Sequence, residues 1–410
     1  MVRKTIAGVL PDEWKGTLIK NICRVVRGSS PRPAGSPLFF DGNFLPWATV
    51  ADLTNSDEMY LTSTKSMLTE AGAERTRITD PGTLMLTNSG ATLGVPKISS
   101  IRCGANDGIA MLLELDGIET EYAYYYLASK TQYFRDVIAP GVGQPNLNTD
   151  LIGDFPIPMP PLAEQKKIAH ILSTWDKAIA TTELLLANSQ QQKKALMQQL
   201  LTGEKRLAGF KQAWSKVKVS KMGSISSGGT PDTTKKEYWD GGINWLTPTD
   251  VTSLKSRYVF STNKTISEKG LKNSSAKMLP GGALLICTRA TIGAMAISTT
   301  EIATNQGFKN LVPNAEFSVE FLYYLFTFNV KELVRKASGS TFLELSKSDF
   351  EKLTFLCPCL DEQHKIASVL IAADDAVSVQ QQKLNHLKQE KKALMQQLLI
   401  GKRRVKVDAE

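Results

Sequence analysis

The nonapeptide KKALMQQLL occupies residues 193–201 and returns unchanged at residues 391–399. Nine identical residues of mixed polar and apolar character are not expected by chance and indicate a longer internal repeat. The segment LAEQKKIAHIL (162–172) corresponds to LDEQHKIASVL (360–370) at the same spacing of 198 positions. The repeat therefore includes the whole of residues 162–201 and its counterpart, residues 360–399.

The repeat also extends upstream of these segments. LPWATVADL (45–53) corresponds to INWLTPTDV (243–251), and SGATLG (89–94) corresponds to RATIG (289–293). The chain thus consists of one unit of about 200 residues used twice, which predicts two similar globular parts related by a pseudo-two-fold repeat.

Composition places the chain among ordinary globular proteins. Of its 410 residues, 42% are hydrophobic and 22% are charged, which is typical of that class. No apolar run approaches the roughly 18 residues of a membrane span, and the apolar stretch near the start is too short for a secretory signal. We therefore expect a cytoplasmic protein whose five cysteines are unpaired thiols.

The net charge of +9 is unevenly distributed along the chain. Residues 1–160 contain 14 Lys and Arg against 17 Asp and Glu, a balance of −3. Residues 206–358 contain 20 against 12, a balance of +8. A basic surface favours a polyanionic partner, but the acidic first part leaves nucleic-acid binding undecided by charge alone.

Each globular part is followed by a segment that predicts a long helix. The helices begin at the proline-rich stretches FPIPMPPL (155–162) and LCPCL (356–360), and they end at Gly203 and Gly401. Proline suits a helix start and glycine suits a helix end. About 38 residues lie between these signals, and a helix of that length spans about 57 Å.

Apolar residues recur in both segments with a period close to 3.5, which predicts a coiled coil. The first seam contains Ile168, Leu172, Trp175, Ile179, Leu186 and Leu196. The second contains Ile366, Leu370, Val377, Leu384 and Leu394. Polar interruptions at Thr182, Ser189, Lys193 and Lys391 weaken the pattern. The alternative is that each helix packs only on its own globular part. Two helices that pair would act as a spacer.

Motifs for catalysis are missing from the sequence. There is no Asn/Asp-Pro-Pro-aromatic loop of a DNA amine methyltransferase and no GxxxxGK[ST] phosphate loop. PDEWK (11–15) fits a charged surface turn better than a nuclease site. CPC (357–359) has no cysteine counterpart at Pro160 and Pro161, so a zinc site is not expected. The chain is predicted to catalyse nothing by itself.

Three segments, together with the order of globular part and helix, carry a family resemblance. GGTPDTTKKEYWDGGINWLTPTDV (228–251), GALLICTRATIG (282–293) and LDEQHKIASVL (360–370) resemble the DNA-specificity subunit of type I restriction–modification enzymes. The resemblance covers essentially the whole chain, and the second half fits it better than the first.

The resemblance implies a fold and a division of labour. Each globular part would be an α/β (α+β) target-recognition domain that reads one half of a bipartite, asymmetric DNA site. The two helices would pair antiparallel, set the gap between the half-sites and dock two modification (methyltransferase) subunits. Restriction subunits would then join. S-adenosylmethionine, ATP and Mg²⁺ would be held by those partners, and no cofactor would be held by this non-catalytic chain.

The expected boundaries follow from the repeat and the resemblance together. They are residues 1–160 for the first recognition domain, 161–205 for the central helix, 206–358 for the second recognition domain, 359–401 for the C-terminal helix and 402–410 for a basic tail. The helix ends that are identical between the two repeats would dock the partner and set the spacing. They would occur twice because two copies of the partner bind.

DNA-contact candidates are basic residues, because these bind phosphates and base edges. In the second domain they are Lys235, Lys236, Arg257, Arg289 and Lys309. In the first they are Arg24, Arg27, Arg32, Lys97 and Arg102. Arg289 is the sharpest candidate, since the first repeat has Ser89 and Gly90 there. The alternative for each is a solvated surface charge. YAYYYLASKTQYF (122–134) is expected to pack in the core rather than stack on bases.

Two rival functions remain open at this point. A coiled-coil scaffold for protein partners alone would show no salt-dependent DNA binding. An enzyme with an unrecognised site would act on DNA as the purified chain, with a divalent metal or S-adenosylmethionine.

Overall fold

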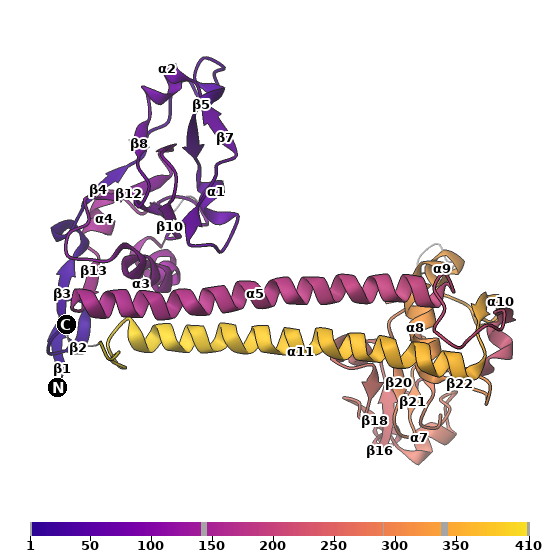
Figure 1. Ribbon diagram of the computed structural model, residues 1–410. Helices are drawn as coiled ribbons and strands as arrows, with labels where there is room; N and C mark the ends of the chain where they lie inside the picture. Colours follow the sequence, from indigo (N-terminus) through magenta and orange to yellow (C-terminus); the bar gives the residue numbers. More distant parts are fainter. Residues whose placement is uncertain (1, 141–145, 290, 338–342, 408–410) are drawn as a thin grey trace. The chain divides into compact units, whose positions relative to one another are not determined.

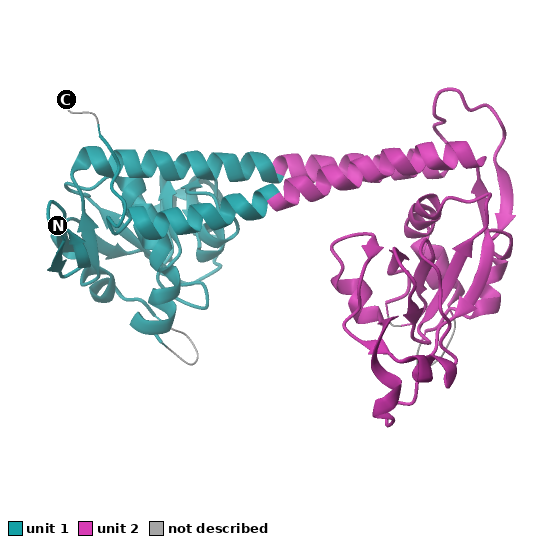
Figure 2. Cartoon of the chain, turned by 90° about the horizontal axis from the view of Figure 1, so that it is seen from below, with its two compact units in different colours: residues 1–183, 383–410 teal, residues 184–382 magenta. Residues whose placement is uncertain are grey.

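A computed structural model describes residues 2–140, 146–289, 291–337 and 343–407. The chain separates into two compact units, unit 1 with residues 1–183 and 383–410 and unit 2 with residues 184–382 (Figure 2). Each unit therefore contains one globular part and a stretch of each long helix. The last residues of the expected basic tail, 408–410, lie outside the described residues.

The globular part of unit 1 is built on two sheets. One has the strand order β4-β12-β9-β10-β6 and the other the order β7-β5-β11-β8, while β1 pairs with β2 and β3 with β13. Neighbours are antiparallel except for the parallel pairs β10 with β6 and β5 with β11. The strands are β1 (Val2–Thr5), β2 (Gly8–Pro11), β3 (Lys15–Leu18), β4 (Arg24–Arg27), β5 (Phe40–Ala48), β6 (Tyr60–Leu61), β7 (Ser66–Leu68), β8 (Arg77–Thr79), β9 (Leu84–Thr87), β10 (Pro96–Ser99), β11 (Cys103–Ala105), β12 (Ile109–Leu113) and β13 (Pro156–Met159).

Helix α3 supplies much of the core of unit 1. Tyr122 and Tyr125 are fully buried in one cluster with Leu84 and Leu86 of the inner strand β9. This confirms the predicted packing role of the tyrosine-rich segment, because these rings are buried rather than exposed to solvent. The helices of this part are α1 (Val50–Thr54), α2 (Glu70–Ala73), α3 (Thr120–Tyr133) and α4 (Thr149–Gly153), with a 3₁₀ turn η1 (Ile19–Asn21) and a π-helical turn η2 (Phe134–Ile138).

The globular part of unit 2 repeats this topology. Its larger sheet has the order β15-β22-β19-β20-β17, which matches β4-β12-β9-β10-β6 strand for strand. The smaller sheet has the order β18-β16-β21, and β14 pairs with β23. The strands are β14 (Ser215–Lys218), β15 (Gly223–Ser227), β16 (Trp239–Leu246), β17 (Tyr258–Val259), β18 (Thr265–Ile266), β19 (Leu284–Cys287), β20 (Met295–Ser298), β21 (Ala303–Thr304), β22 (Phe308–Pro313) and β23 (Thr354–Cys357).

Helix α8 takes the place of α3 in unit 2. Phe321, Tyr324 and Phe326 are buried in one cluster with Leu284 and Ile286 of β19. The helices are α6 (Pro248–Ser253), α7 (Glu268–Lys272), α8 (Val319–Phe328), α9 (Val330–Lys336) and α10 (Lys347–Lys352), with 3₁₀ turns η3 (Val219–Lys221) and η4 (Lys236–Tyr238). Both globular parts are mixed α and β, as the sequence predicts.

One repeated aspartate shows why the short motifs are preserved. Asp52 accepts a hydrogen bond from the backbone N–H of Thr49 (2.8 Å) and another from that of Lys65 (2.9 Å). Asp250 does the same with Thr247 (2.8 Å) and with the residue thirteen positions after itself (3.2 Å). The carboxylate thus caps a short helix and holds a second loop, and neither Asn nor Glu would reproduce both contacts.

The two long helices begin after prolines and end before a glycine. Helix α5 (Leu162–Leu201) and helix α11 (Leu360–Leu398) are uninterrupted. Gly203 and Gly401 follow them with φ of +74° and +69°, a left-handed conformation that glycine adopts without strain. The predicted long helices are confirmed. No helix in the described ranges is both long and apolar enough for a membrane span.

The helices pack on each other inside each unit. In unit 1, Ile168 and Leu172 near the start of α5 share a cluster with Leu398 and Leu399 at the end of α11. In unit 2 the corresponding cluster contains Met197, Leu200, Ile366 and Leu370. Since the start of one helix meets the end of the other both times, the helices are antiparallel (Figure 1).

The seam predicted from the sequence faces inward along both helices. The buried members are Ile168, Leu172, Leu186, Ile366, Leu370 and Leu384. The half-buried members are Trp175, Ile179, Leu196, Val377 and Leu394. Of the polar interruptions, Thr182 is buried and donates its hydroxyl to the Ala178 carbonyl of its own helix (2.8 Å).

Candidate nucleic-acid interface and helix junctions

Arg24 and Arg102 lie on the surface of unit 1. Arg24 pairs with Glu114 at 3.0 Å and Arg102 with Asp80 at 3.8 Å, and all four side chains are mostly exposed. Exposed ion pairs of this kind contribute little to stability. Both guanidinium groups can therefore exchange these partners for phosphate at small cost.

Arg27 and Arg32 both contact Asp107, one at its backbone and the other at its side chain. The backbone carbonyl of Asp107 accepts a hydrogen bond from Arg27, and its side chain lies 3.6 Å from Arg32 and accepts a hydrogen bond from Ser30 at 2.6 Å. That Ser30 bond, helped by the two arginines, holds the pKa of Asp107 below its ordinary value. Arg77 also reaches this place and donates to the Arg27 carbonyl. Sequence reasoning missed Arg77, which joins the cluster only through the fold.

Lys97 is placed inside unit 1 rather than on its surface. Its side chain is buried, and its ammonium donates to the carbonyls of Ser56 (2.8 Å) and Glu58. Burial lowers its pKa. The residue holds the loop in front of β6, so a DNA contact would require this loop to open.

Lys235 and Lys236 are exposed in unit 2, at the beginning of η4. The Lys235 ammonium lies 3.3 Å from the Tyr238 hydroxyl and 5.2 Å from the centre of its ring. Lys236 has no ion-pair partner among the described residues. Both remain accessible to a polyanion.

Arg289 forms a three-residue cluster with Glu344 and Lys309. The guanidinium lies 2.7 Å from one carboxylate oxygen, and the buried Lys309 ammonium lies 3.5 Å from the other. Hydrogen bonding from Arg289 holds the pKa of Glu344 below its ordinary value, while burial lowers the pKa of Lys309. Arg289 is 45% exposed and Lys309 only 5%. Of the two candidates, only Arg289 therefore presents its charge to solvent.

The same backbone position carries different chemistry in the first repeat. An isolated bridge joins Arg289 to Glu344 in unit 2, and an equivalent bridge joins Ser89 to Asn146 in unit 1. The fold thus presents a charged pair on one globular part and a neutral polar pair on the other.

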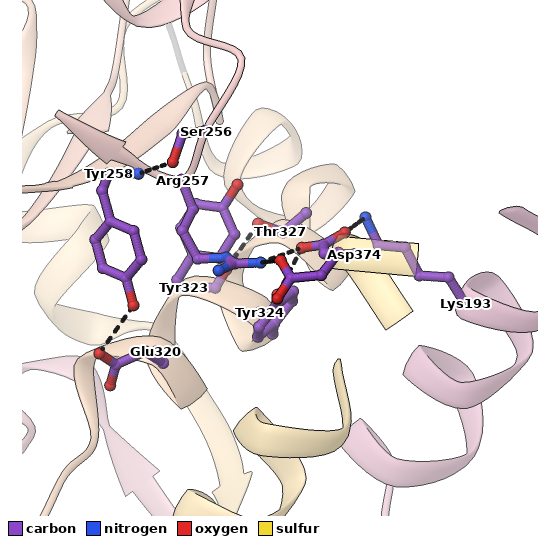
Figure 3. Close-up of polar contacts among 10 residues, drawn as sticks. Lys193, Ser256, Arg257, Tyr258, Glu320, Tyr323, Tyr324, Thr327 and Asp374 are labelled. Atoms are coloured by element: carbon purple, nitrogen blue, oxygen red, sulfur yellow. Dashed lines mark hydrogen bonds and ion pairs between the residues drawn. The ribbon is translucent and has the colours of Figure 1, made fainter. Parts of the chain in front are cut away.

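Arg257 lies at the junction between the globular part of unit 2 and helix α11 (Figure 3). Its guanidinium is 3.5 Å from Asp374 and 3.2 Å from Asp375, and its side chain is 12% exposed. It also covers the ring of Tyr258, whose hydroxyl donates to Glu320 at 3.3 Å. Arg257 therefore connects the globular part to helix α11, and little of its side chain remains exposed for a DNA contact.

Asp374 is the centre of this junction. Tyr324 of α8 donates its hydroxyl to one carboxylate oxygen at 2.5 Å, and Lys193 of α5 pairs with the other (Figure 3). Burial raises the pKa of Tyr324, and the neighbouring Asp374 carboxylate raises it further. One aspartate thus ties together the globular part and both long helices.

Unit 1 contains the matching cluster. Tyr125 of α3 donates to Asp176 of α5 at 2.6 Å, and Lys391 of α11 pairs with the same carboxylate. Met59 occupies the position in unit 1 that Arg257 occupies in unit 2. Of these two equivalent positions, only the one in unit 2 therefore provides an arginine for the junction. Asp176 and Lys391 are each 198 positions from their counterparts, like the flanking motifs.

A second repeated cluster closes the ends of the helices. The Glu164 carboxylate, almost fully buried, accepts hydrogen bonds from Trp14 (3.0 Å) and Arg404 (2.7 Å). In unit 2, Glu362 accepts equivalent bonds from Trp214 (3.2 Å) and Arg206 (2.7 Å). Hydrogen bonding to the glutamates raises the pKa of both arginines.

The glutamine after each glutamate is equally constrained. Gln165 accepts a hydrogen bond from the Glu119 N–H (2.7 Å) and donates to the carbonyls of Gly117 (3.1 Å) and Pro160 (2.9 Å). Gln363 makes the matching three bonds in unit 2. The repeated Glu-Gln pair is thus a buried and fully satisfied polar joint.

Sequence reasoning treated Lys193 and Lys391 only as interruptions of the seam and did not identify Asp176 or Asp374. The available signal was identity between the repeats, since all four are preserved at one spacing. The described residues contain no group of three or more His, Cys, Asp or Glu side chains placed to hold a metal ion. Cys357 is buried and Cys359 half-buried at the start of α11.

Comparison with known families gives one match in two copies. The family described as type I restriction modification DNA specificity domain matches residues 11–188 and again residues 211–389. The two matches coincide with the two repeats, and each includes one globular part and most of the helix that follows.

Two relatives and one solved structure illustrate the similarity. The MjaIX type I restriction enzyme specificity subunit of Methanocaldococcus jannaschii is 39% identical over 166 residues, 40% of this chain and 38% of that subunit. The putative MjaX specificity subunit of the same organism is 28% identical over 305 residues, 70% of this chain and 69% of that subunit. The crystal structure of a type I restriction–modification S subunit from M. genitalium has a TM-score of 0.60 at 15% identity, covering 94% of this chain and 96% of that one. This last likeness concerns the fold.

Proposed function

The chain belongs to the type I restriction modification DNA specificity family, and from this we propose that it is the sequence-reading subunit of such a complex. Residues 1–160 and 206–358 each contact one half of a bipartite, asymmetric DNA site. The chain is non-catalytic and works in the cytoplasm. Methyl transfer and cleavage belong to modification and restriction subunits, which bind S-adenosylmethionine, ATP and Mg²⁺.

The proposal that the DNA site is asymmetric rests on a difference between the two repeats. Arg289 and Glu344 occupy the bridge position that Ser89 and Asn146 occupy in the first repeat. An arginine recognises guanine through two hydrogen bonds, whereas asparagine pairs with adenine and serine does not distinguish the two. Equivalent scaffolds with different side chains at one position are what two unlike half-sites require.

Replacing Arg289 by alanine should change recognition of one half-site alone. A bidentate arginine–guanine contact contributes about 1–3 kcal/mol of discrimination, so methylation of the native site should fall roughly 5- to 150-fold relative to sites altered in that half. The measurement is methylation of a plasmid library in which each half-site is randomised in turn.

Arg335→Ala is the matched control, because Arg335 is also an exposed arginine paired with a glutamate in unit 2, at 2.5 Å. It should leave both half-sites unchanged. If Arg289→Ala relaxes both halves equally, or neither, the base-reading role of Arg289 is wrong.

An exposed stripe on each helix supports docking of two identical modification subunits. Gln191, Lys194, Ala195 and Gln198 are exposed and follow an i, i+3, i+4, i+7 pattern, which places them on one face of α5. The same four residues stand at the corresponding positions of α11 and are exposed there too. Exposed side chains contribute little to the folding of their own chain, so their identity favours a shared partner. Exposed positions nearer the helix middle, such as Leu184, are not repeated.

Charge reversal within the stripe should remove bound modification subunits one at a time. Lys194→Glu or Lys392→Glu alone should lower the number bound per chain from two to one, and the double variant should bind none. Native mass spectrometry of the mixed subunits reads this directly. Lys177→Glu, which reverses an exposed but unrepeated lysine of α5, should keep both copies bound. Two copies retained by the double variant would exclude this face.

Salt-dependent DNA binding separates the specificity role from a scaffold of protein partners alone. The complex of this chain with its modification subunit should bind a plasmid with an affinity that falls steeply between about 50 and 200 mM salt, because phosphate contacts release counterions. Omitting the chain should abolish selective binding. Equal binding by the modification subunit alone would favour the scaffold.

A further inference from the structure

Each unit contains an ion pair between a lysine at a seam position and an aspartate beside the seam of the other helix. Lys193 pairs with Asp374 in unit 2, and Lys391 pairs with Asp176 in unit 1. The four side chains are between 20% and 40% exposed. Ion pairs at such sites add little net stability compared with well-packed apolar residues. Stability therefore does not explain why both repeats keep them.

Polar residues in a coiled-coil seam are best known for selecting one register among several. A slip of one heptad would bring Asp374 opposite Leu186 or Leu200 in place of Lys193. It would likewise bring Asp176 opposite Leu384 or Leu398. All four leucines are buried. Every such slip places a carboxylate against leucine and leaves a lysine without its partner, which is costly in a half-buried position.

A tyrosine connects this register to each globular part. Tyr324 and Tyr125 donate to the same aspartates from α8 and α3, whose buried residues lie in the cores of their units. Each aspartate is therefore fixed by a hydrogen bond from its own globular part. It forms its ion pair in the helix register that places a lysine opposite it. The helices on their own would have only the leucine pattern, which tolerates a shift of seven residues.

We propose that the clusters Tyr125–Asp176–Lys391 and Tyr324–Asp374–Lys193 select the antiparallel register of α5 and α11, and thereby fix the gap between the two half-sites. The second clause rests on the proposed function. A slip of one heptad moves the helices by about 10 Å, which corresponds to about three base-pair steps of 3.4 Å. These residues act as positioning residues and touch no DNA themselves.

The test replaces the four charged residues of the two pairs by leucine: Asp176→Leu, Lys193→Leu, Asp374→Leu and Lys391→Leu together. Distances are measured by electron paramagnetic resonance between spin labels on cysteines at 177 and 392 in unit 1, and at 194 and 372 in unit 2. All four positions are exposed. The half-buried Cys23 and Cys359 are replaced by serine beforehand. The wild-type chain should give one narrow distance for each pair, and the leucine variant a second, longer distance, because a slip of about 10 Å along the axis separates labels that lie opposite each other in the wild-type register.

Two control variants separate register from general disturbance. Glu183→Leu with Lys388→Leu removes an exposed interhelical ion pair of unit 1, at 2.7 Å, and should keep one distance. Charge exchange in the unit 1 cluster, with Lys391→Asp and Asp176→Lys, places no lysine beside Arg257 and should keep the single distance. If the fourfold leucine variant does not fold, Lys193→Leu with Lys391→Leu removes the lysine of both clusters, keeps both tyrosine–aspartate hydrogen bonds and carries the same expectation.

Methylation mapping with unlabelled chains tests the consequence for the gap. The leucine variant should methylate sites whose gap differs by about three base pairs in addition to native sites, whereas both controls should keep one gap. An unshifted single distance in the leucine variants overturns the register role. A shifted distance with an unchanged gap overturns the link from register to DNA spacing, and with it the proposed ruler function, although the register role itself stands.

Discussion

Inserting seven residues into each long helix should lengthen the gap between the half-sites by about three base pairs and abolish methylation at native sites. Seven residues add about 10 Å to a helix, and base pairs are stacked about 3.4 Å apart. The insertions belong between Ser189 and Gln190 of α5 and between Val377 and Ser378 of α11. Genomic methylation of cells that express the variant with its modification subunit gives the new gap.

The matching insertion in α11 is essential because the helices are paired within each unit. A heptad keeps both leucine seams continuous, whereas four residues in α5 alone would rotate its seam away from its partner. A chain with the heptad in α5 only is therefore the control and should lose activity without gaining a new motif. Retention of the native gap by the doubly lengthened chain would show that the helices do not set it.

Replacing Arg404 by alanine should lower the free energy of unfolding of unit 1 by about 2 kcal/mol. Arg404 supplies two of the three hydrogen bonds to the Glu164 carboxylate, which is 2% exposed. A buried charge that loses its partner is costly, typically about 3–5 kcal/mol, and 39% exposure of Arg404 lets water replace part of the loss. The melting temperature of unit 1 should fall by about 4–8 °C.

Two neighbouring substitutions make this measurement specific. Arg403→Ala removes an exposed arginine one position earlier and should leave the melting temperature within about 1 °C, as surface substitutions usually do. Arg404→Lys keeps the charge but loses the forked geometry, so it should fall between the two. Equal melting of the Arg404→Ala and wild-type chains would mean that Glu164 is stabilised without the arginine.

The sequence shows that the ends of the two helices are repeated, but it does not show which residues those ends contact. The seven-residue period of the leucines predicts pairing, and identity between the repeats predicts that the ends matter. What the sequence does not contain is the partner of each end. Met197 and Leu200 pack with Ile366 and Leu370 within unit 2, so the inner face of the nonapeptide is required by the fold. Only its outer stripe is left for a docking partner.

Candidate DNA contacts show a similar limit. Basic character identifies residues able to meet phosphate, yet burial depends on strand pairing that local patterns do not determine. Lys97 and Lys309 occupy inner strands, and their ammonium groups are held by carbonyls or by Glu344. Arg257 faces α11, which follows it by about a hundred residues in sequence. The exposed Arg24, Arg27, Arg32, Arg102, Lys235, Lys236 and Arg289 carry the DNA-binding proposal.

Sheet topology was the least accessible feature. Parallel pairs such as β5 with β11 and β10 with β6 join strands separated by dozens of residues, and short strands of two to five residues carry little periodic signal. Asp52 and Asp250 illustrate what repetition can add, because their preserved spacing from a preceding threonine marks the same capping box twice.

The most direct measurement is genome-wide mapping of methylated bases in cells that express this chain with its modification subunit, compared with cells that express the modification subunit alone. We predict one methylated motif, made of two different short half-sites separated by a fixed gap, that is present only when the chain is expressed. Methylation that is the same with and without the chain, or a motif without two parts, would contradict it.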